Sequence, residues 1–135
     1  MPATRYWAVL DRGKELARIT SEDELEFVLR SVPQSATSPN AIVNLSSPSG
    51  DTLSIGMSGA LACLNFMDST GDPPYLTAVG NATLSPEDGV QVFRYEGQWT
   101  EIPTRNCVPL DTAIRVAREF YRTGELPDFL EWEEV

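Results

Sequence analysis

The N-terminal third of the chain shows first the spacing of a strand and then that of a helix. Residues 5–10 (RYWAVL) are aromatic and aliphatic and precede a turn at residues 11–13, which predicts a first strand. Ser21 and Glu24 form a capping box, so a helix is expected to begin there, and Pro33 is expected to end it. We expect the acidic residues of this helix to lie mostly on a solvated face. Its apolar residues recur at helical spacing and form one buried stripe: Leu25, Val28, Leu29 and Val32.

The middle of the chain changes to the alternation with period two that is typical of strands. Residues 41–45 form one expected strand, and residues 53–58 alternate between apolar and small polar or glycine residues, which indicates a sheet with one buried face. Residues 61–67 are apolar on both faces and predict a central strand. A loop at residues 68–74 follows. Three further strands are expected, the last two joined as a hairpin around Glu96 and Gly97: residues 75–79, 90–95 and 98–102.

A second helix is the clearest feature of the C-terminal third. Pro109 suits its first turn, and Gly124 stands where the glycine after a helix is expected. Asp111 and Glu119 each lie four residues from Arg115 and are expected to pair with it. A short strand or extended segment containing Trp132 should then pack back onto the sheet. The helix has one apolar stripe: Leu110, Ala113, Ile114, Ala117, Phe120 and Tyr121.

These elements predict an α+β fold. We expect a single domain over residues 1–135, with an antiparallel sheet of about six to eight strands and two principal helices packed on one face.

Composition excludes several kinds of chemistry. The chain has no histidine, so Ser/His or Cys/His nucleophile pairs and imidazole metal sites are absent. Its two cysteines, Cys63 and Cys107, are too far apart in sequence for a metal motif and are expected to be reduced core residues. No cofactor and no metal are expected. The chain shows neither an export signal nor an apolar stretch long enough to span a membrane, so the expected location is the cytoplasm.

The charge balance bears on the kind of partner. Twenty acidic residues against ten basic ones give a net charge of −10, which disfavours direct binding of nucleic acid. Such a field speeds encounter with a basic partner, although it also serves solubility alone. Two stretches concentrate the acids, residues 68–101 and 125–135. If the fold brings them to one side, they form a negative patch that suits a basic cleft; a scattered, solvated surface is the alternative.

Carboxylate pairs are the available acid and base groups. The pair Asp68 and Asp72, or the pair Glu96 and Glu101, is a candidate for general acid and base catalysis, but twenty acids in a short chain place some pairs close by chance. The ligand spacing of a calcium loop is missing around Asp68. Trp99 shares a strand face with Glu101 and is a candidate for either a core residue or an interface anchor.

Several motifs in the C-terminal half are found together in one known family. They occur in this order: Gly97, Trp99-Thr100-Glu101-Ile102-Pro103, Val108-Pro109-Leu110, Ala117, Glu119-Phe120, Thr123-Gly124, Pro127 and Glu131-Trp132. Asp68, Gly71, Tyr75-Leu76-Thr77 and Gly80 add to them upstream. Over residues 61–134 the chain resembles the actinobacterial-type immunity proteins of bacterial polymorphic toxin systems, whose toxins are often nucleic-acid deaminases.

The resemblance implies a protein without catalysis that binds one toxin domain and occludes its active site or substrate cleft. The toxin domain that it leads us to expect is a DNA cytidine deaminase with a basic face. Charge, loops and aromatic residues suggest six contact residues: Asp68, Asp72, Tyr75, Glu96, Trp99 and Glu101. Two other functions stay open. One is a small carboxylate-dependent hydrolase or lyase, and the other is a general acidic adaptor for a basic protein.

Overall fold

The computed structural model describes residues 6–11, 14–35, 40–58, 61–71, 75–79, 90–95, 98–103 and 106–134. Along the chain the elements are β1 (Trp7–Asp11), β2 (Lys14–Ile19), α1 (Glu22–Ser35), β3 (Asn40–Ser46), β4 (Thr52–Ser58), β5 (Leu61–Met67), β6 (Leu76–Val79), β7 (Val90–Tyr95), β8 (Gln98–Pro103), β9 (Cys107–Pro109), α2 (Leu110–Thr123) and β10 (Glu131–Glu134).

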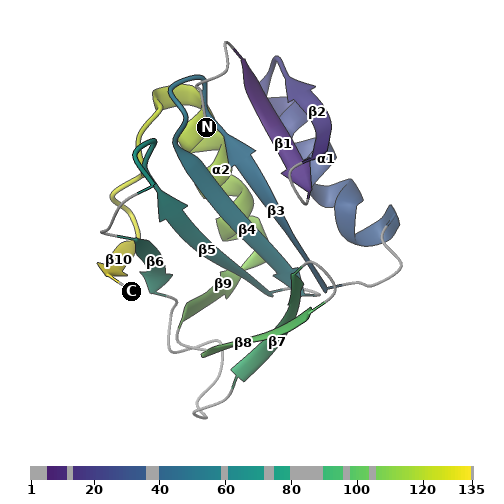
Figure 1. Cartoon of the computed structure of the whole chain (residues 1–135), viewed down its shortest axis with the longest axis vertical. Helices are drawn as coiled ribbons and strands as arrows, with labels where there is room; N and C mark the ends of the chain where they lie inside the picture. The colour runs from purple at the N-terminus through teal and green to yellow at the C-terminus, as the bar shows by residue number, and fades with distance from the viewer. Residues whose placement is uncertain are drawn as a thin grey trace.

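Eight of these strands form one antiparallel sheet. Its order is β10-β6-β5-β4-β3-β1-β2, and β9 also pairs with β5. One edge of β5 is therefore shared, because β9 pairs with Leu61–Cys63 and β6 pairs with Asn65 and Phe66. Strands β7 and β8 form a separate hairpin that lies beside β3 and β4 at one end of the sheet (Figure 1). The expected α+β fold with an antiparallel sheet and two helices is confirmed.

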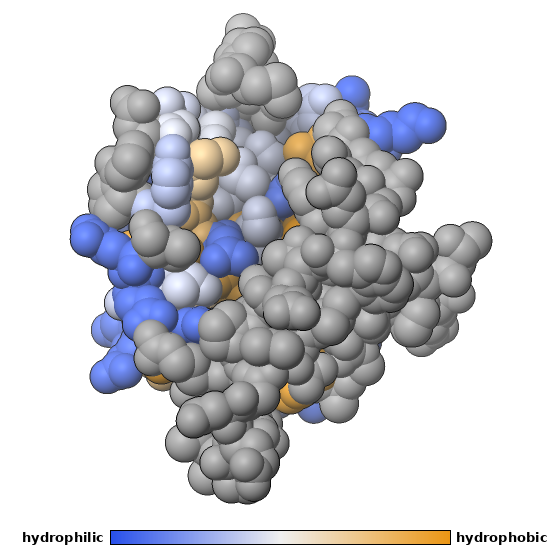
Figure 2. All heavy atoms as spheres, turned by 60° about the horizontal axis from the view of Figure 1, so that its bottom comes forward, coloured by the Kyte–Doolittle hydropathy of each residue, from blue (hydrophilic) through white to orange (hydrophobic). Residues whose placement is uncertain are grey.

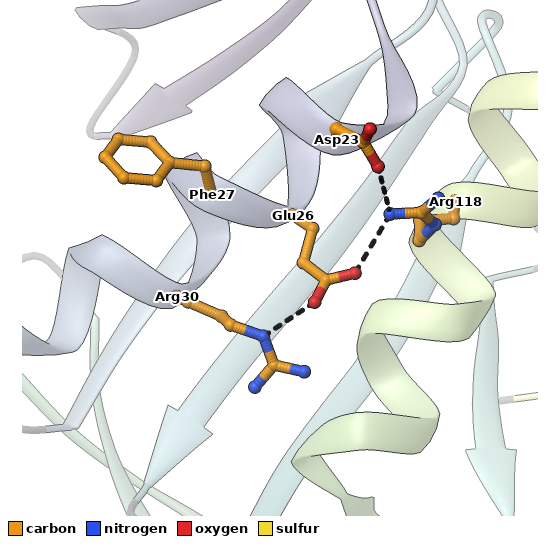
Figure 3. A pocket seen from close by; sticks show the side chains of 5 residues that line it. All are labelled: Asp23, Glu26, Phe27, Arg30 and Arg118. Atoms are coloured by element: carbon orange, nitrogen blue, oxygen red, sulfur yellow. Dashed lines mark hydrogen bonds and ion pairs between the residues drawn. The ribbon is translucent and has the colours of Figure 1, made fainter.

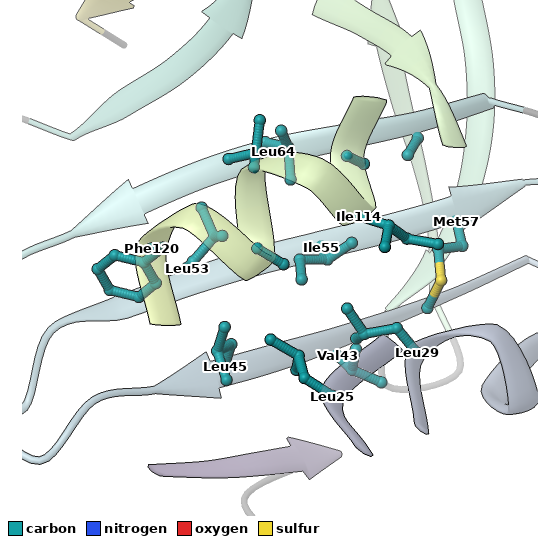
Figure 4. Packing of buried hydrophobic residues seen from close by; sticks show 14 of the residues in the cluster. Leu25, Leu29, Val43, Leu45, Leu53, Ile55, Met57, Leu64, Ile114 and Phe120 are labelled. Carbon is teal, nitrogen blue, oxygen red and sulfur yellow. The ribbon is translucent and has the colours of Figure 1, made fainter. Parts of the chain in front are cut away.

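Both helices pack on the same face of the sheet and bury its alternating apolar residues. Every second residue of β4 points to this side, and Leu53, Ile55 and Met57 are all fully buried. Leu25 and Leu29 of α1, with Ile114 and Phe120 of α2, lie over these strands (Figure 4). Burial of this apolar surface is the main stabilising contribution to the fold.

Helix α1 begins as the capping box predicts, with one difference. The Glu24 backbone N–H donates to Ser21 Oγ at 3.1 Å, as expected. The Glu24 carboxylate, however, accepts from the backbone N–H of Thr20 at 2.7 Å, one residue before the serine. The prediction that Pro33 ends the helix was wrong, since α1 continues to Ser35. A proline so close to the end of a helix removes only one backbone hydrogen bond, so the last turn still forms.

Helix α2 follows β9 directly, and its C-terminal end matches the sequence prediction. Pro109 is its N-cap, and Gly124 adopts a left-handed conformation with φ of 77°. The Gly124 N–H donates to the Phe120 carbonyl at 2.7 Å, which satisfies one of the last carbonyl groups of the helix.

Strands β2 and β9 have no counterpart in the sequence prediction. The sequence of β2, KELARI, is rich in helix-forming residues and lacks strict alternation. It forms a strand because β1 offers it a complete antiparallel ladder from Trp7↔Ile19 to Asp11↔Lys14. Tertiary pairing thus overrides local propensity at this edge of the sheet.

Candidate functional site

The sheet face opposite the helices carries polar residues on its central strands. Asn44 of β3 and Ser54 of β4 are directly opposed across the ladder, and Ser54 Oγ donates to Asn44 Oδ1 at 2.6 Å. Neither helix covers this face, which is turned toward the viewer in Figure 1. We refer to it as the open face. Its polar centre explains why the strands alternate between apolar and polar residues.

A pocket of about 390 Å³ lies on the open face, at the end where β5 leads into the next loop. Apolar and polar groups both contribute to its lining, and two carboxylates, Glu15 and Asp68, belong to it. We call it the open-face pocket, and its lining residues come from four separate stretches of the chain: Tyr6, Ala8, Leu10, Glu15, Asn44, Ser46, Gly50, Thr52 and Met67–Gly71.

Asp68 is held in one orientation by the loop that follows β5. Its Oδ1 accepts a hydrogen bond from the Thr70 backbone N–H at 3.0 Å and another from the Thr70 hydroxyl. Its backbone carbonyl accepts from the Gly71 N–H at 3.0 Å, and Gly71 has φ of 74°. The hydrogen bonds from Thr70 lower the pKa of Asp68, so the side chain is a carboxylate at neutral pH. Among the described residues it forms no ion pair.

Two further hydrogen bonds connect this loop to its surroundings. The Ser69 N–H donates to Asp51 Oδ1 at 2.9 Å, which joins it to the turn between β3 and β4. The Tyr75 hydroxyl donates to the Gly71 carbonyl at 2.7 Å, while the Tyr75 side chain itself remains exposed. Asp68 and Tyr75 therefore belong to one braced structure. The sequence analysis did not identify Asp51, because its role depends on a contact with a residue 18 positions away.

The other end of the open-face pocket is built differently. A β-bulge between Val9 and Leu10 shifts the pairing so that Glu15 lies opposite Leu10. The Glu15 carboxylate then pairs with Arg18 Nε at 3.4 Å, and the Arg18 guanidinium lies over the Tyr6 ring at 4.1 Å. This end already contains its own cation, whereas the Asp68 end has none among the described residues.

The other predicted site residues are Asp72, Glu96, Trp99 and Glu101. Asp72 and Glu96 fall outside the described residues. Trp99 and Glu101 belong to β8, where they pair in the backbone ladder with Arg94 and Val92. The hairpin lies near the start of β5 (Figure 1), whereas Asp68 follows the last residue of β5. The length of β5, about 20 Å, separates the two ends. The structure thus brings Asp68 and Tyr75 together, and it places β8 at a distance from them.

The helix face carries a network of ion pairs between α1 and α2. Arg118 Nη1 lies 3.0 Å from Glu26 and 3.2 Å from Asp23, and Arg30 pairs with Glu26 at 2.9 Å (Figure 3). Hydrogen bonds from Arg30 lead the effects that lower the pKa of Glu26. Of the acids expected on a solvated face, Asp23 and Glu24 are exposed, whereas Glu22 and Glu26 are half-buried beside Arg118.

The pairs expected within α2 are wrong. Arg115 pairs with neither expected partner, and its guanidinium lies over the Phe129 ring at 4.2 Å instead. Asp111 pairs with Arg30 at 2.9 Å, and Glu119 pairs with Arg122. Asp111 has this partner because α1 packs against α2, which the spacing within one helix does not reveal.

Helices α1 and α2, with 14 residues each, hold about a fifth of the 135 residues and about a fifth of the net charge of −10, so the excess negative charge is spread along the chain. The two helices hold six acidic and four basic residues. Hydrophilic residues gather at the side of the molecule where β6 and β10 lie (Figure 2). Strand β10 itself carries three glutamates, Glu131, Glu133 and Glu134. On the helices, Arg30, Arg118 and Arg122 form ion pairs with acidic side chains.

Asn106 is a buried polar residue that the sequence analysis missed. It is 6% exposed, and its Nδ2 donates to the Ala78 carbonyl at 3.1 Å and to Glu133 Oε1 at 3.0 Å. One side chain thus links the chain just before β9 to both β6 and β10. Nothing in the local sequence signals this role, because its partners are 27 and 28 residues away.

Asp68 is suited to accept hydrogen bonds rather than to act as a general acid. A general acid needs a carboxyl group with a raised pKa, whereas hydrogen bonding lowers the pKa of Asp68. Within the described part of the chain, no group of three or more His, Cys, Asp and Glu side chains is placed to hold a metal ion. No helix in that part is both long and apolar enough to cross a membrane.

Comparison with protein families gives a match. The family model described as "Immunity protein Imm1" matches residues 13–134, which is nearly the whole chain. No curated protein matches the sequence.

Proposed function

The chain belongs to the Imm1 family of immunity proteins, whose partner is a toxin, and we propose that its toxin is a nucleic-acid deaminase that it neutralises by covering the substrate cleft. A DNA cytidine deaminase is the form that the sequence resemblance suggests. In this proposal the chain performs no catalysis, and it acts in the cytoplasm of the cell that makes the toxin.

The observation that carries the deaminase proposal is the net negative charge of the chain. A deaminase that acts on nucleic acid presents a basic surface to its substrate. The chain has a net charge of −10, and the open-face pocket contains an ionised carboxylate, Asp68, with no cation beside it among the described residues. A basic cleft and a negatively charged protein attract each other, which raises the association rate.

We propose that six residues contact the toxin: Asp68, Asp72, Tyr75, Glu96, Trp99 and Glu101. The Asp68 loop and the hairpin stand at opposite ends of the open face, about 20 Å apart. A partner that reaches both would cover roughly the 800 Å² per protein that is typical of a stable complex. Tyr75, exposed and held by its hydroxyl, suits an anchoring role at one end.

The first experiment measures binding and inhibition together. The purified protein is titrated into the toxin domain encoded beside it, by calorimetry at two salt concentrations, and deaminase activity is followed at increasing molar ratio. Nanomolar 1:1 binding that weakens with salt, with activity lost at equivalence, is the expected result. A complex with a toxin of another activity would contradict the deaminase assignment but not the family.

A second experiment tests which face binds. Charge reversal of Glu96 and Glu101 should weaken binding by tenfold or more, because two attractive contacts become repulsive. The matched control reverses Asp23 and Asp111, which lie on the helix face with side chains 94% and 86% exposed. Such exposed ion pairs contribute little to stability, so the control should fold and bind almost normally. Equal losses in both variants would refute the placement of the interface.

A further inference from the structure

The open-face pocket has a carboxylate at each end, and among the described residues only one of the two has a cation beside it. Glu15 and Asp68 stand on opposite sides of it, separated by β1, β3 and β4. Four strand spacings of about 4.8 Å put them roughly 19 Å apart, so one side chain cannot reach both carboxylates. Glu15 already pairs with Arg18 at 3.4 Å, and among the described residues Asp68 pairs with no cation.

Asp68 is prepared to accept hydrogen bonds from outside the chain. Both bonds from Thr70 go to Oδ1, which fixes the carboxylate and leaves Oδ2 without a hydrogen bond among the described residues. The loop that holds it is braced by Asp51 and by the Tyr75 hydroxyl. A fixed carboxylate loses little conformational freedom when it is bound, so a cation that reaches it gains most of the interaction energy.

The remaining lining matches an arginine side chain. Met67 is 40% exposed beside Asp68, and its thioether chain can contact the aliphatic part of an arginine. Asn44, Ser46 and Thr52 supply polar groups at the floor of the pocket. A guanidinium has five N–H donors and is weakly hydrated, so it suits a site with several oxygen acceptors better than a compact ammonium does.

We propose that the Asp68 end of the open-face pocket receives one arginine side chain of the partner protein. This inference rests on the proposed function for the identity of the partner, a toxin with a basic surface. The guanidinium donates to Asp68 Oδ2, and the arginine stem lies along Met67. The Glu15 end, which is neutralised from within the chain, receives no cation.

Two variants, each of which removes one negative charge from the pocket, test the site in the complex. Asp68→Asn removes the charge but keeps an oxygen that can accept from Thr70, so the loop should hold its shape. Glu15→Gln makes the same change at the other end of the pocket. Asp68→Asn should weaken toxin binding by about tenfold or more, because it removes a charge-assisted hydrogen bond. Glu15→Gln should weaken toxin binding by about threefold or less. Equal losses would refute the arginine site while leaving the inhibitor function intact.

A probe without the toxin separates the site from the function. The free protein is titrated with N-acetyl-arginine amide, and the amide NMR signals of residues 68–71 are followed. We expect shifts that saturate in the wild type and vanish in Asp68→Asn. Equal shifts with N-acetyl-lysine amide would overturn the preference for arginine. Shifts that depend on protein concentration alone would assign the pocket to a second copy of this chain. If the arginine probe binds but the toxin does not, the site stands and the proposed function fails.

Discussion

Phe120 offers the most direct test of how the helix layer stabilises the sheet. Its side chain is fully buried, and its ring meets Trp7 edge to face at 5.0 Å between centroids and Phe66 at 5.8 Å. Trp7 comes from β1 and Phe66 from β5, so one aromatic side chain of α2 connects strands on both sides of β3 and β4. Phe120→Ala would leave a cavity between α2 and these strands.

The expected loss follows from volume and from the ring contacts. Replacing a buried phenylalanine by alanine costs about 3–5 kcal/mol of unfolding free energy, and the two aromatic pairs place this site in the upper half of the range. For a chain of this length, 1 kcal/mol corresponds to roughly 4 °C in Tm, so the variant should melt about 15 °C below the wild type. Phe120→Leu keeps most of the apolar volume and should lose about 1–2 kcal/mol.

Chemical denaturation followed by tryptophan fluorescence measures these differences. Phe27→Ala is the matched control, because the same change falls on a side chain that is 73% exposed on α1. It should change the unfolding free energy by no more than about 0.5 kcal/mol. The reasoning would be refuted if Phe120→Ala lost less than about 1 kcal/mol, or if Phe27→Ala lost as much as Phe120→Ala.

Two further predictions concern ionisable groups. Burial raises the pKa of Cys63 to about 12 and also raises the pKa of Cys107. Neither thiol should therefore react with a disulfide reagent in the folded protein, while both should react after unfolding. Rapid reaction of the native protein would contradict this. Hydrogen bonds from Arg30 lower the pKa of Glu26 below its ordinary value of 4.5. The ionised Glu26 side chain therefore stabilises the fold fully above about pH 4.5, and this stabilisation is lost as the pH falls through the pKa of Glu26 in the folded protein. Denaturation at a series of pH values should therefore show a smaller acid loss for Glu26→Gln than for the wild type, and parallel curves would refute the role of this pair.

The parts of the fold that could be predicted are those recorded in local periodicity. The alternation around Ile55 and the stripe that includes Phe120 identified a strand and a helix, because each pattern reflects one face of one element. Strand β2 could not be found in this way, since its sequence favours a helix and only β1 makes it a strand. The ion pairs of Arg118 join residues 92 and 95 positions apart, which spacing within a helix does not show.

The candidate site was only partly predictable for the same reason. Asp68 and Tyr75 stood out because a loop rich in Asp, Gly and Pro follows a buried strand. The pocket around Asp68 depends on the strand order, which brings β1 and β3 beside β4 and β5 although β1 lies far away in sequence. Whether Trp99 and Glu101 contact the toxin remains a prediction.

The shared edge of β5 has a consequence for how the protein can change over time. The chain leaves the sheet after Val79 and returns at Cys107, and the two strands concerned pair with neighbouring parts of β5. Asn106 holds the returning chain to Ala78, so the two ends of the excursion are anchored beside each other. The β7–β8 hairpin belongs to the segment between these two anchored ends. Lengthening a segment with fixed ends costs little free energy, so a change in its length should leave the strand register of β5 unaltered.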